Sequence, residues 1–179
     1  MTRYIVLLRG INVGGHRRVA MNDLGTLLTD LGYRDVRTHL QSGNVVLTSN
    51  ASAARIRQAI EEALAAKYGD GIEIFVRTRK ELADVIDGDR LRAVADNASR
   101  YVVMFLSGKP DASAIRAAKA ADLGGEDFVV VGSVIYAWCP DGLHNAKLAK
   151  LLSEKRLGVS ATARNWNTVV KLLELADAT

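Results

Sequence analysis

Ten residues near the N-terminus combine glycine with positive charge in a way that suits the binding of an anion. They follow an apolar run, and the members that could contact a ligand are Arg9, Gly10, Asn12, Gly14, Gly15, Arg17 and Arg18. Glycine lets backbone N–H groups approach a ligand closely, and successive N–H groups form concave anion sites. Arginine adds bidentate contacts to phosphate or carboxylate. The segment therefore predicts a site for a small anionic, phosphorylated ligand.

The same segment also has a purely structural interpretation. Its glycines permit a tight connection from a strand to a helix, which would leave the arginines in solvent. The segment is not a Walker A loop, because no Gly-Lys-Ser/Thr closes it, and it lacks the G-x-G-x-x-G spacing of dinucleotide-binding folds. Both interpretations stay open at the level of the sequence.

Two further segments could supply polar groups to the same ligand. Gln41, Ser42 and Asn44 offer directional hydrogen bonds, although such residues also favour turns for local reasons. Arg164 and Asn165 precede a predicted terminal helix, whose N-terminus would complete an anion pocket. The structural alternative is that Asn165 caps this helix and that the following tryptophan packs it onto the body of the protein.

No residue pattern identifies a reaction, a metal or a cofactor. His16, His39 and His144 lack metal-ligand spacing, and a lone cysteine, Cys139, argues against a structural zinc site. Cys139 ends an apolar strand and is expected to be a small buried side chain. His16 is the one nominated general base. We expect no cofactor, and whether the protein is an enzyme stays open.

The composition is that of a globular protein with a mild positive charge. The chain has 179 residues, 49% of them hydrophobic, and a formal net charge of +4. It has no apolar run long enough to cross a membrane, and a strand-like start argues against a signal peptide. Its single cysteine fits a reducing cytoplasm. We therefore expect a cytoplasmic protein without membrane association, of undetermined oligomeric state.

Hydrophobic periodicity and turn residues predict the order βαββαβ in the first half of the chain. Helices with an apolar stripe are expected at residues 24–31 and 56–64, ending at Gly32 and Gly69. Strands are expected at residues 4–8, 36–41, 44–48 and 72–76. This order is typical of the ferredoxin-like, split βαβ arrangement.

The second half restarts the same plan after a predicted linker. A capping box at Thr78–Glu81 opens residues 79–99, a helical and irregular linker between subdomains 1–78 and 100–179. An apolar strand, an alanine-rich helix and a hairpin follow, but Ser160–Asn165 and a terminal helix stand in place of a fourth strand. The predicted fold is α+β, with two ferredoxin-like (split βαβ) subdomains, the second incomplete and ending in a C-terminal helix.

Strand order predicts that two of the polar segments are neighbours. In a split βαβ sheet the first strand lies beside the third, and the two run antiparallel. The first strand ends at Arg9, and the third begins at Asn44. Both segments must then emerge at one end of the sheet, so the glycine-rich loop and the turn at residues 41–44 are expected to lie side by side.

Three segments together resemble one family. Arg9–Gly15, Gln41–Val46 and Ala163–Val169 are similar to the uncharacterised bacterial family called domain of unknown function 1697, and the resemblance covers essentially the whole chain. It implies an α+β fold with ferredoxin-like subdomains and no assigned activity. The family usually has Asn-Lys and then Pro after the glycines, where this chain has Arg17-Arg18 and Ala20. Its frequent Gly-x-Ser-Lys-Leu is His144-Asn145-Ala146-Lys147-Leu148 here.

Two other functions compete with the binding of a small anion. Ferredoxin-like sheets bind RNA when their central strands expose aromatic side chains. In the first half Tyr4 alone serves the first strand and Asn44–Thr48 has no aromatic residue, which argues against this mode of binding. The other alternative is a non-catalytic scaffold or assembly domain, which an exposed apolar patch would favour.

Overall fold

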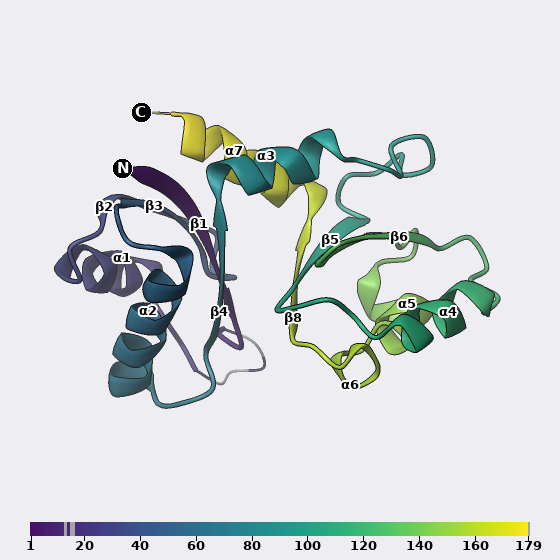
Figure 1. Cartoon of the computed structure of the whole chain (residues 1–179), viewed down its shortest axis with the longest axis horizontal. Helices are drawn as coiled ribbons and strands as arrows, with labels where there is room; N and C mark the ends of the chain where they lie inside the picture. The colour runs from purple at the N-terminus through teal and green to yellow at the C-terminus, as the bar shows by residue number, and fades with distance from the viewer. Residues whose placement is uncertain (13, 15–16, 179) are drawn as a thin grey trace. The chain divides into compact units, whose positions relative to one another are not determined.

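The computed structural model describes residues 1–12, 14 and 17–178 of the chain (Figure 1). Two compact units divide it: Met1–Asp84 together with Lys171–Thr179, and Val85–Val170. Each unit contains one four-stranded antiparallel sheet with helices, and a C-terminal helix ends the chain. The α+β class predicted from the sequence is therefore confirmed. No helix among the described residues has the length and apolar character needed to span a bilayer.

The first unit has the order of elements expected from the sequence. Its strands pair in the order β2-β3-β1-β4, which is the split βαβ arrangement. The strands are β1 (Thr2–Arg9), β2 (Arg34–His39), β3 (Asn44–Ser49) and β4 (Glu73–Thr78). The helices are α1 (Met21–Asp30), α2 (Ala53–Tyr68) and the start of α3 (Arg79–Asp87), which ends in the second unit.

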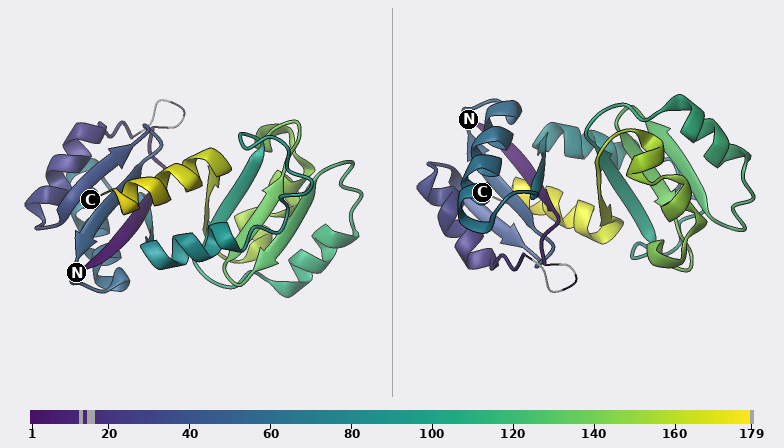
Figure 2. Two further views of the ribbon diagram at one scale, coloured as in Figure 1. Left: turned by 90° about the horizontal axis from the view of Figure 1, so that it is seen from above. Right: turned by 90° about the horizontal axis from the view of Figure 1, so that it is seen from below.

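Alternation of side chains along β1 builds the core of this unit. Tyr4, Val6 and Leu8 point to one face of the sheet and are buried there with the apolar stripes of α1 and α2. Both helices cover this same face (Figures 1 and 2). Of the predicted stripe residues, Leu24, Leu28, Ile56, Ile60 and Leu64 are fully buried, whereas Leu31 at the C-terminal end of α1 is 40% exposed. The core therefore holds β1 at the centre of the sheet.

The second unit repeats the strand order of the first, as β6-β7-β5-β8. Its strands are β5 (Tyr101–Leu106), β6 (Asp127–Val131), β7 (Val134–Trp138) and β8 (Ala161–Asn165). Its helices are α4 (Ala112–Ala120), the 3-10 turn η1 (Leu143–Asn145), α5 (Lys147–Leu151) and α6 (Glu154–Leu157). The last helix, α7 (Trp166–Asp177), begins in this unit and ends in the first.

The expectation that this unit lacks a fourth strand is wrong. Residues 161–165 form β8, which pairs antiparallel with β5 from Val102↔Asn165 to Leu106↔Ala161. The segment was missed because alanine and asparagine have low strand propensity and no apolar alternation marks it. It becomes a strand because β5 offers a free edge for backbone hydrogen bonds. What departs from the repeated plan is the second helix, which is divided into η1, α5 and α6.

The boundaries of the compact units differ from the domain boundaries predicted from the sequence. The division falls inside α3 and inside α7, and residues 171–178 group with the first unit. The sequence pattern groups them with the second unit and predicts that residues 79–99 are a linker. The domain boundaries 1–78 and 100–179 stay a prediction.

The capping box of α3 generates a first test. Thr78 N–H donates to the Glu81 carboxylate (2.7 Å), and Glu81 N–H donates to Thr78 Oγ1 (3.1 Å), which confirms the motif. We expect Thr78→Ala to lower the free energy of unfolding by about 1 kcal/mol, since a helix N-terminal N–H group loses its acceptor. Urea unfolding measures this change. The control Thr78→Ser keeps the hydroxyl, and an equal loss in both variants would contradict the capping role.

Candidate functional site

The glycine-rich loop leaves the sheet where three strand ends meet. β1 ends at Arg9, which is opposite Glu73 at the start of β4, while Leu7 is opposite Asn44 at the start of β3. Gly10 then turns the chain with φ +81°. A Cβ built on Gly10 would lie 3.2 Å from the Gly71 carbonyl oxygen, so a side chain would crowd the approach of the two segments.

Asn12 ties the base of this loop together. Its backbone N–H donates to the Arg17 carbonyl oxygen (3.1 Å), and its Oδ1 accepts a hydrogen bond from Val19 N–H (2.9 Å). Its Nδ2 donates to the carbonyl oxygens of Val19 (3.0 Å) and Gln41 (2.6 Å). Asn12 also has a left-handed backbone, with φ 55°, which asparagine tolerates better than most residues. With both ends of its amide engaged, Asn12 shapes the loop.

The loop and the turn at residues 41–44 are neighbours, as predicted. Besides the bond from Asn12 to Gln41, the Leu8 N–H donates to the Gly43 carbonyl oxygen (2.8 Å). Asn44 is fully buried, and its Nδ2 donates to the His39 carbonyl oxygen (2.8 Å) and to Ser42 Oγ (3.0 Å). Asn44 therefore holds the turn from inside, whereas Gln41 and Ser42 are exposed.

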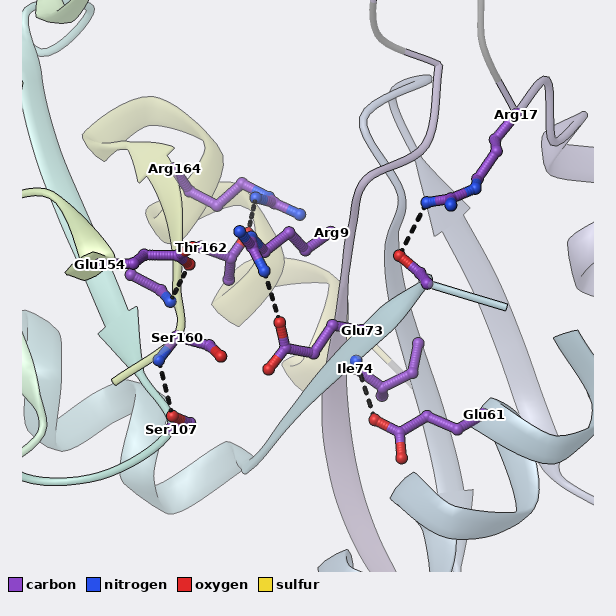
Figure 3. Close-up of polar contacts among 12 residues, drawn as sticks. Arg9, Arg17, Glu61, Glu73, Ile74, Ser107, Glu154, Ser160, Thr162 and Arg164 are labelled. Atoms are coloured by element: carbon purple, nitrogen blue, oxygen red, sulfur yellow. Dashed lines mark hydrogen bonds and ion pairs between the residues drawn. The ribbon is translucent and has the colours of Figure 1, made fainter. Parts of the chain in front are cut away.

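Arg9 and Arg17 are held by different partners. Arg9 forms an ion pair with Glu73, with Nη1 2.6 Å from Oε2, so a carboxylate balances its charge (Figure 3). Arg17 donates from Nη1 to the Gly71 carbonyl oxygen at 2.9 Å, a neutral partner (Figure 3). A Cβ on Gly71 would lie 2.6 Å from Arg17 Nη2, so glycine there makes room for the guanidinium. Arg17 itself is exposed and left-handed, with φ 49°.

The remaining loop residues are only partly described. Gly14 is exposed with φ 62°, and Arg18 is exposed. Across the described residues, no hydrogen bond or ion pair engages the Arg18 side chain. Gly15 and His16, which the sequence analysis nominated as ligand-binding residue and general base, lie outside the described residues.

Arg164 and Asn165 belong to the second unit and have internal partners there. Arg164 is 8% exposed and donates to Thr162 Oγ1 at 2.8 Å (Figure 3). It also donates to the Ala163 carbonyl oxygen at 2.8 Å. Burial lowers the pKa of its guanidinium to about 10. Asn165 Oδ1 accepts from Thr168 N–H (2.9 Å), which confirms it as the cap of α7. A role of these residues in ligand binding stays a prediction.

The second sheet carries an aromatic face that sequence reasoning overlooked. Its central strands β5 and β7 bear four aromatic side chains, with Tyr101 opposite Trp138 and Val103 opposite Tyr136. The pattern resembles a base-stacking platform, but all four are at most 8% exposed: Tyr101, Phe105, Tyr136 and Trp138. Trp166 stacks on Tyr101 with ring centroids 4.9 Å apart. Base stacking on this face would therefore require the covering residues to move.

Two partners of the loop were also missed. The sequence analysis places Glu73 in a predicted strand and gives no role to Gly71. The split βαβ order contained the signal, because it places the start of the fourth strand beside the end of the first. Among the described residues, no cluster of three metal-ligating side chains is present.

Comparison with known proteins adds a family and a fold. A family model described as "Protein of unknown function (DUF1697)" matches residues 1–136. A conserved bacterial protein from Streptococcus pneumoniae has a similar structure, with a TM-score of 0.78, 24% identity and 98% of each chain covered. This likeness shows the fold alone. An unknown protein from Galdieria sulphuraria reaches a TM-score of 0.27 at 16% identity over 92% and 98% of the two chains, which carries no argument. No curated protein matches.

Gly43 offers a test of the tight contact between the turn and the loop. Its φ is +77°, and an added Cβ would lie 2.7 Å from both Leu8 Cβ and Ile11 Cδ1. Gly32 has a similar φ of +87°, but nothing lies within 4 Å of its Cβ position. We expect Gly32→Ala to cost about 1–2 kcal/mol for left-handed strain, and Gly43→Ala to cost about 1–3 kcal/mol more for the clash. Equal losses in urea unfolding would contradict this contact.

Cys139 is a buried thiol whose chemistry can be measured. Desolvation, with a smaller contribution from Glu126, raises its pKa to about 11. The thiolate is the reactive form, so we expect iodoacetamide at pH 8 to modify the native protein far more slowly than the protein in urea. Mass spectrometry follows the reaction. Equal rates in the two states would show that Cys139 is accessible and reactive.

Proposed function

Because the chain belongs to the family described as "Protein of unknown function (DUF1697)", whose description names no activity, we propose a function from the site itself. The protein binds a small anionic, phosphorylated ligand at the rim formed by the glycine-rich loop and the neighbouring turn. We call this place the loop rim. Its proposed ligand contacts are the exposed members of the predicted set: Gly10, Gly14, Arg17, Arg18, Gln41 and Ser42.

One observation carries the proposal: among the described residues, the guanidinium of Arg17 is held by a carbonyl oxygen and has no carboxylate partner. Its described partner is the Gly71 carbonyl oxygen, which orients the group but leaves its charge uncompensated. Arg9, a few residues earlier, is neutralised by Glu73. An oriented guanidinium at an exposed loop suits phosphate, which accepts two parallel N–H bonds.

Backbone strain in the loop supports the same proposal. Asn12 and Arg17 are both left-handed without being glycine, and each such residue costs on the order of 1 kcal/mol. The strain persists because the hydrogen bonds of Asn12 and Arg17 over-determine the loop. Strain of this kind gathers at ligand-binding loops on rigid scaffolds.

The other predicted residues have supporting roles in this proposal. Asn12 and Asn44 shape the loop and the turn, and Arg9 with Glu73 sets the charge at the end of β1. No reaction is proposed. We place the function in the cytoplasm, since a single cysteine that is buried and unpaired suits a reducing compartment.

Replacing Arg17 tests the loop rim. In a thermal-shift screen of nucleotides, sugar phosphates and pyrophosphate at constant ionic strength, a ligand of the native state raises Tm. For the compound with the largest shift, we expect Arg17→Gln to weaken binding roughly tenfold in calorimetry, since one charge-assisted contact is lost. The free energy of unfolding should change by no more than about 0.5 kcal/mol, because Arg17 is exposed.

The matched control is Arg57→Gln. Arg57 is an exposed arginine on α2 of the same unit, so the variant has the same change of net charge. We expect its affinity to equal that of the unmodified protein. Equal weakening by the two variants would show an effect of net charge alone, and the absence of any stabilising phosphorylated compound would refute the proposed function.

A further inference from the structure

The second unit contains a hollow beside α5 that the loop rim does not involve. Its volume is about 640 Å³, within the range of small-molecule sites. The wall comes from the segment after α4, from η1 and α5, and from α6, and α4 itself lies against α5 (Figure 1). We call it the α5 hollow. Its lining residues with charge or with a titratable ring are Asp122, His144, Lys147, Lys150 and Arg156.

Asp122, which lines the hollow, and Glu126, which bonds to the start of α5, already have partners. Both oxygens of the Glu126 carboxylate accept bonds at the start of α5, from Lys147 N–H (2.8 Å) and Leu148 N–H (2.8 Å). The Lys147 ammonium donates to the Asp122 carbonyl oxygen (2.8 Å) and lies 3.9 Å from Asp122 Oδ2. Gly124 permits this approach, since its Cβ position lies 3.4 Å from Lys147 Nζ.

Lys150 and Arg156 are the cations that remain. Both are exposed, and within the described part of the chain no hydrogen bond or ion pair engages either side chain. They come from α5 and α6, so two separate elements direct positive charge to one concave surface. His144 of η1 and Lys147 and Lys150 of α5 all line the hollow, although the extended backbone of Ala146 separates the two helical segments.

Apart from Asn145, the rest of the lining is apolar. Ala121, Ala146, Ala149 and Leu151 contribute carbon surface between the charged groups. Lysines on an ordinary convex helix surface would not have this concave apolar surface beside them. A concave surface with an apolar floor and a cationic edge suits an organic molecule with a phosphate group, because the floor takes the carbon skeleton and the cations take the anion.

We propose that the α5 hollow is a second ligand site, which binds a small phosphorylated organic molecule of up to nucleotide size. Lys150 and Arg156 contact the phosphate groups, Lys147 adds positive charge from its position against Asp122, and the alanine and leucine side chains contact the organic part. The site lies in the second unit and shares no residue with the loop rim, so it does not depend on the function proposed there.

The test uses the full chain labelled with nitrogen-15 and titrated with ADP or with pyrophosphate at constant ionic strength. We expect saturable shifts of the amide signals of Ala121, Asn145 and Ala149. ADP should bind more tightly than pyrophosphate, since only ADP covers the apolar floor. Absence of shifts at these amides would overturn the proposal, and equal affinities would overturn the assignment to an organic ligand.

Two double variants separate a site from bulk charge. Lys150→Gln with Arg156→Gln should weaken ADP binding at these amides roughly tenfold or more, as charge-assisted contacts are lost. Arg116→Gln with Lys119→Gln removes the same charge from exposed positions of α4 and should leave the affinity within about twofold. Equal weakening of ADP binding by both double variants would show a diffuse polyanion-binding surface in place of the site. Binding of single-stranded oligonucleotides of any sequence as tightly as ADP would show the same.

This experiment distinguishes a failure of the α5 hollow proposal from a failure of the loop rim proposal. Arg17→Gln alters the loop rim and should leave the ADP-dependent shifts of Ala121, Asn145 and Ala149 unchanged. Dispersed spectra of all variants in the absence of ligand would show that each is folded. Loss of the α5 shifts in Arg17→Gln would contradict the independence of the α5 hollow.

Discussion

The central position of β1 is the constraint on which the loop rim depends. β1 pairs with β3 on one edge and β4 on the other, antiparallel to both. Its carboxyl end therefore lies between the amino ends of its two neighbours, at strand spacings of about 4.8 Å. The approach to β4 brings Gly71, the start of β4 brings Glu73, and the turn before β3 brings Ser42 and Gly43. These segments meet only because the sheet has this order.

Different surroundings give the arginines of this protein different capacities for binding. Arg9 pairs with a carboxylate, so an incoming anion would have to compete with Glu73. Arg164 is buried against hydroxyl and carbonyl oxygens, and burial lowers its pKa. Arg17 is oriented by a carbonyl oxygen and exposed to solvent. A guanidinium that is already oriented loses less conformational entropy when an anion binds, which makes Arg17 the strongest candidate.

Much of this fold could be predicted because its apolar pattern is regular. The stripes of α1 and α2 and the hairpin between β2 and β3 follow directly from periodicity and turn residues. β8 could not be found in this way, since Ala161–Asn165 becomes a strand through its pairing with β5. The same limit applies to side chains. The loop and the turn at residues 41–44 were correctly predicted to be neighbours, but only the structure shows that the side-chain amides of Asn12 and Asn44 are engaged inside the protein.

The aromatic face of the second unit shows a further limit of sequence reasoning. Tyr136 donates its hydroxyl to the Val85 carbonyl oxygen (2.7 Å), and Tyr101 donates to Asp89 Oδ1 (2.6 Å). These bonds come from the segment before β5, far from the aromatic residues in sequence. The positions of aromatic residues along the strands do not reveal that another segment of the chain buries them. The burial of these aromatic residues argues against nucleic-acid binding. This argument is stronger than the one from the scarcity of aromatic residues on the central strands of the first sheet.

Crystals grown with tungstate, a heavy analogue of phosphate, would test the central claim most directly. The anomalous signal locates the anion without reference to any variant. The account predicts a peak within hydrogen-bonding distance of the Arg17 guanidinium, with Arg9 still paired to Glu73. Anion peaks confined to other surfaces, with Arg17 still bonded to Gly71 and no anion at the loop, would contradict it.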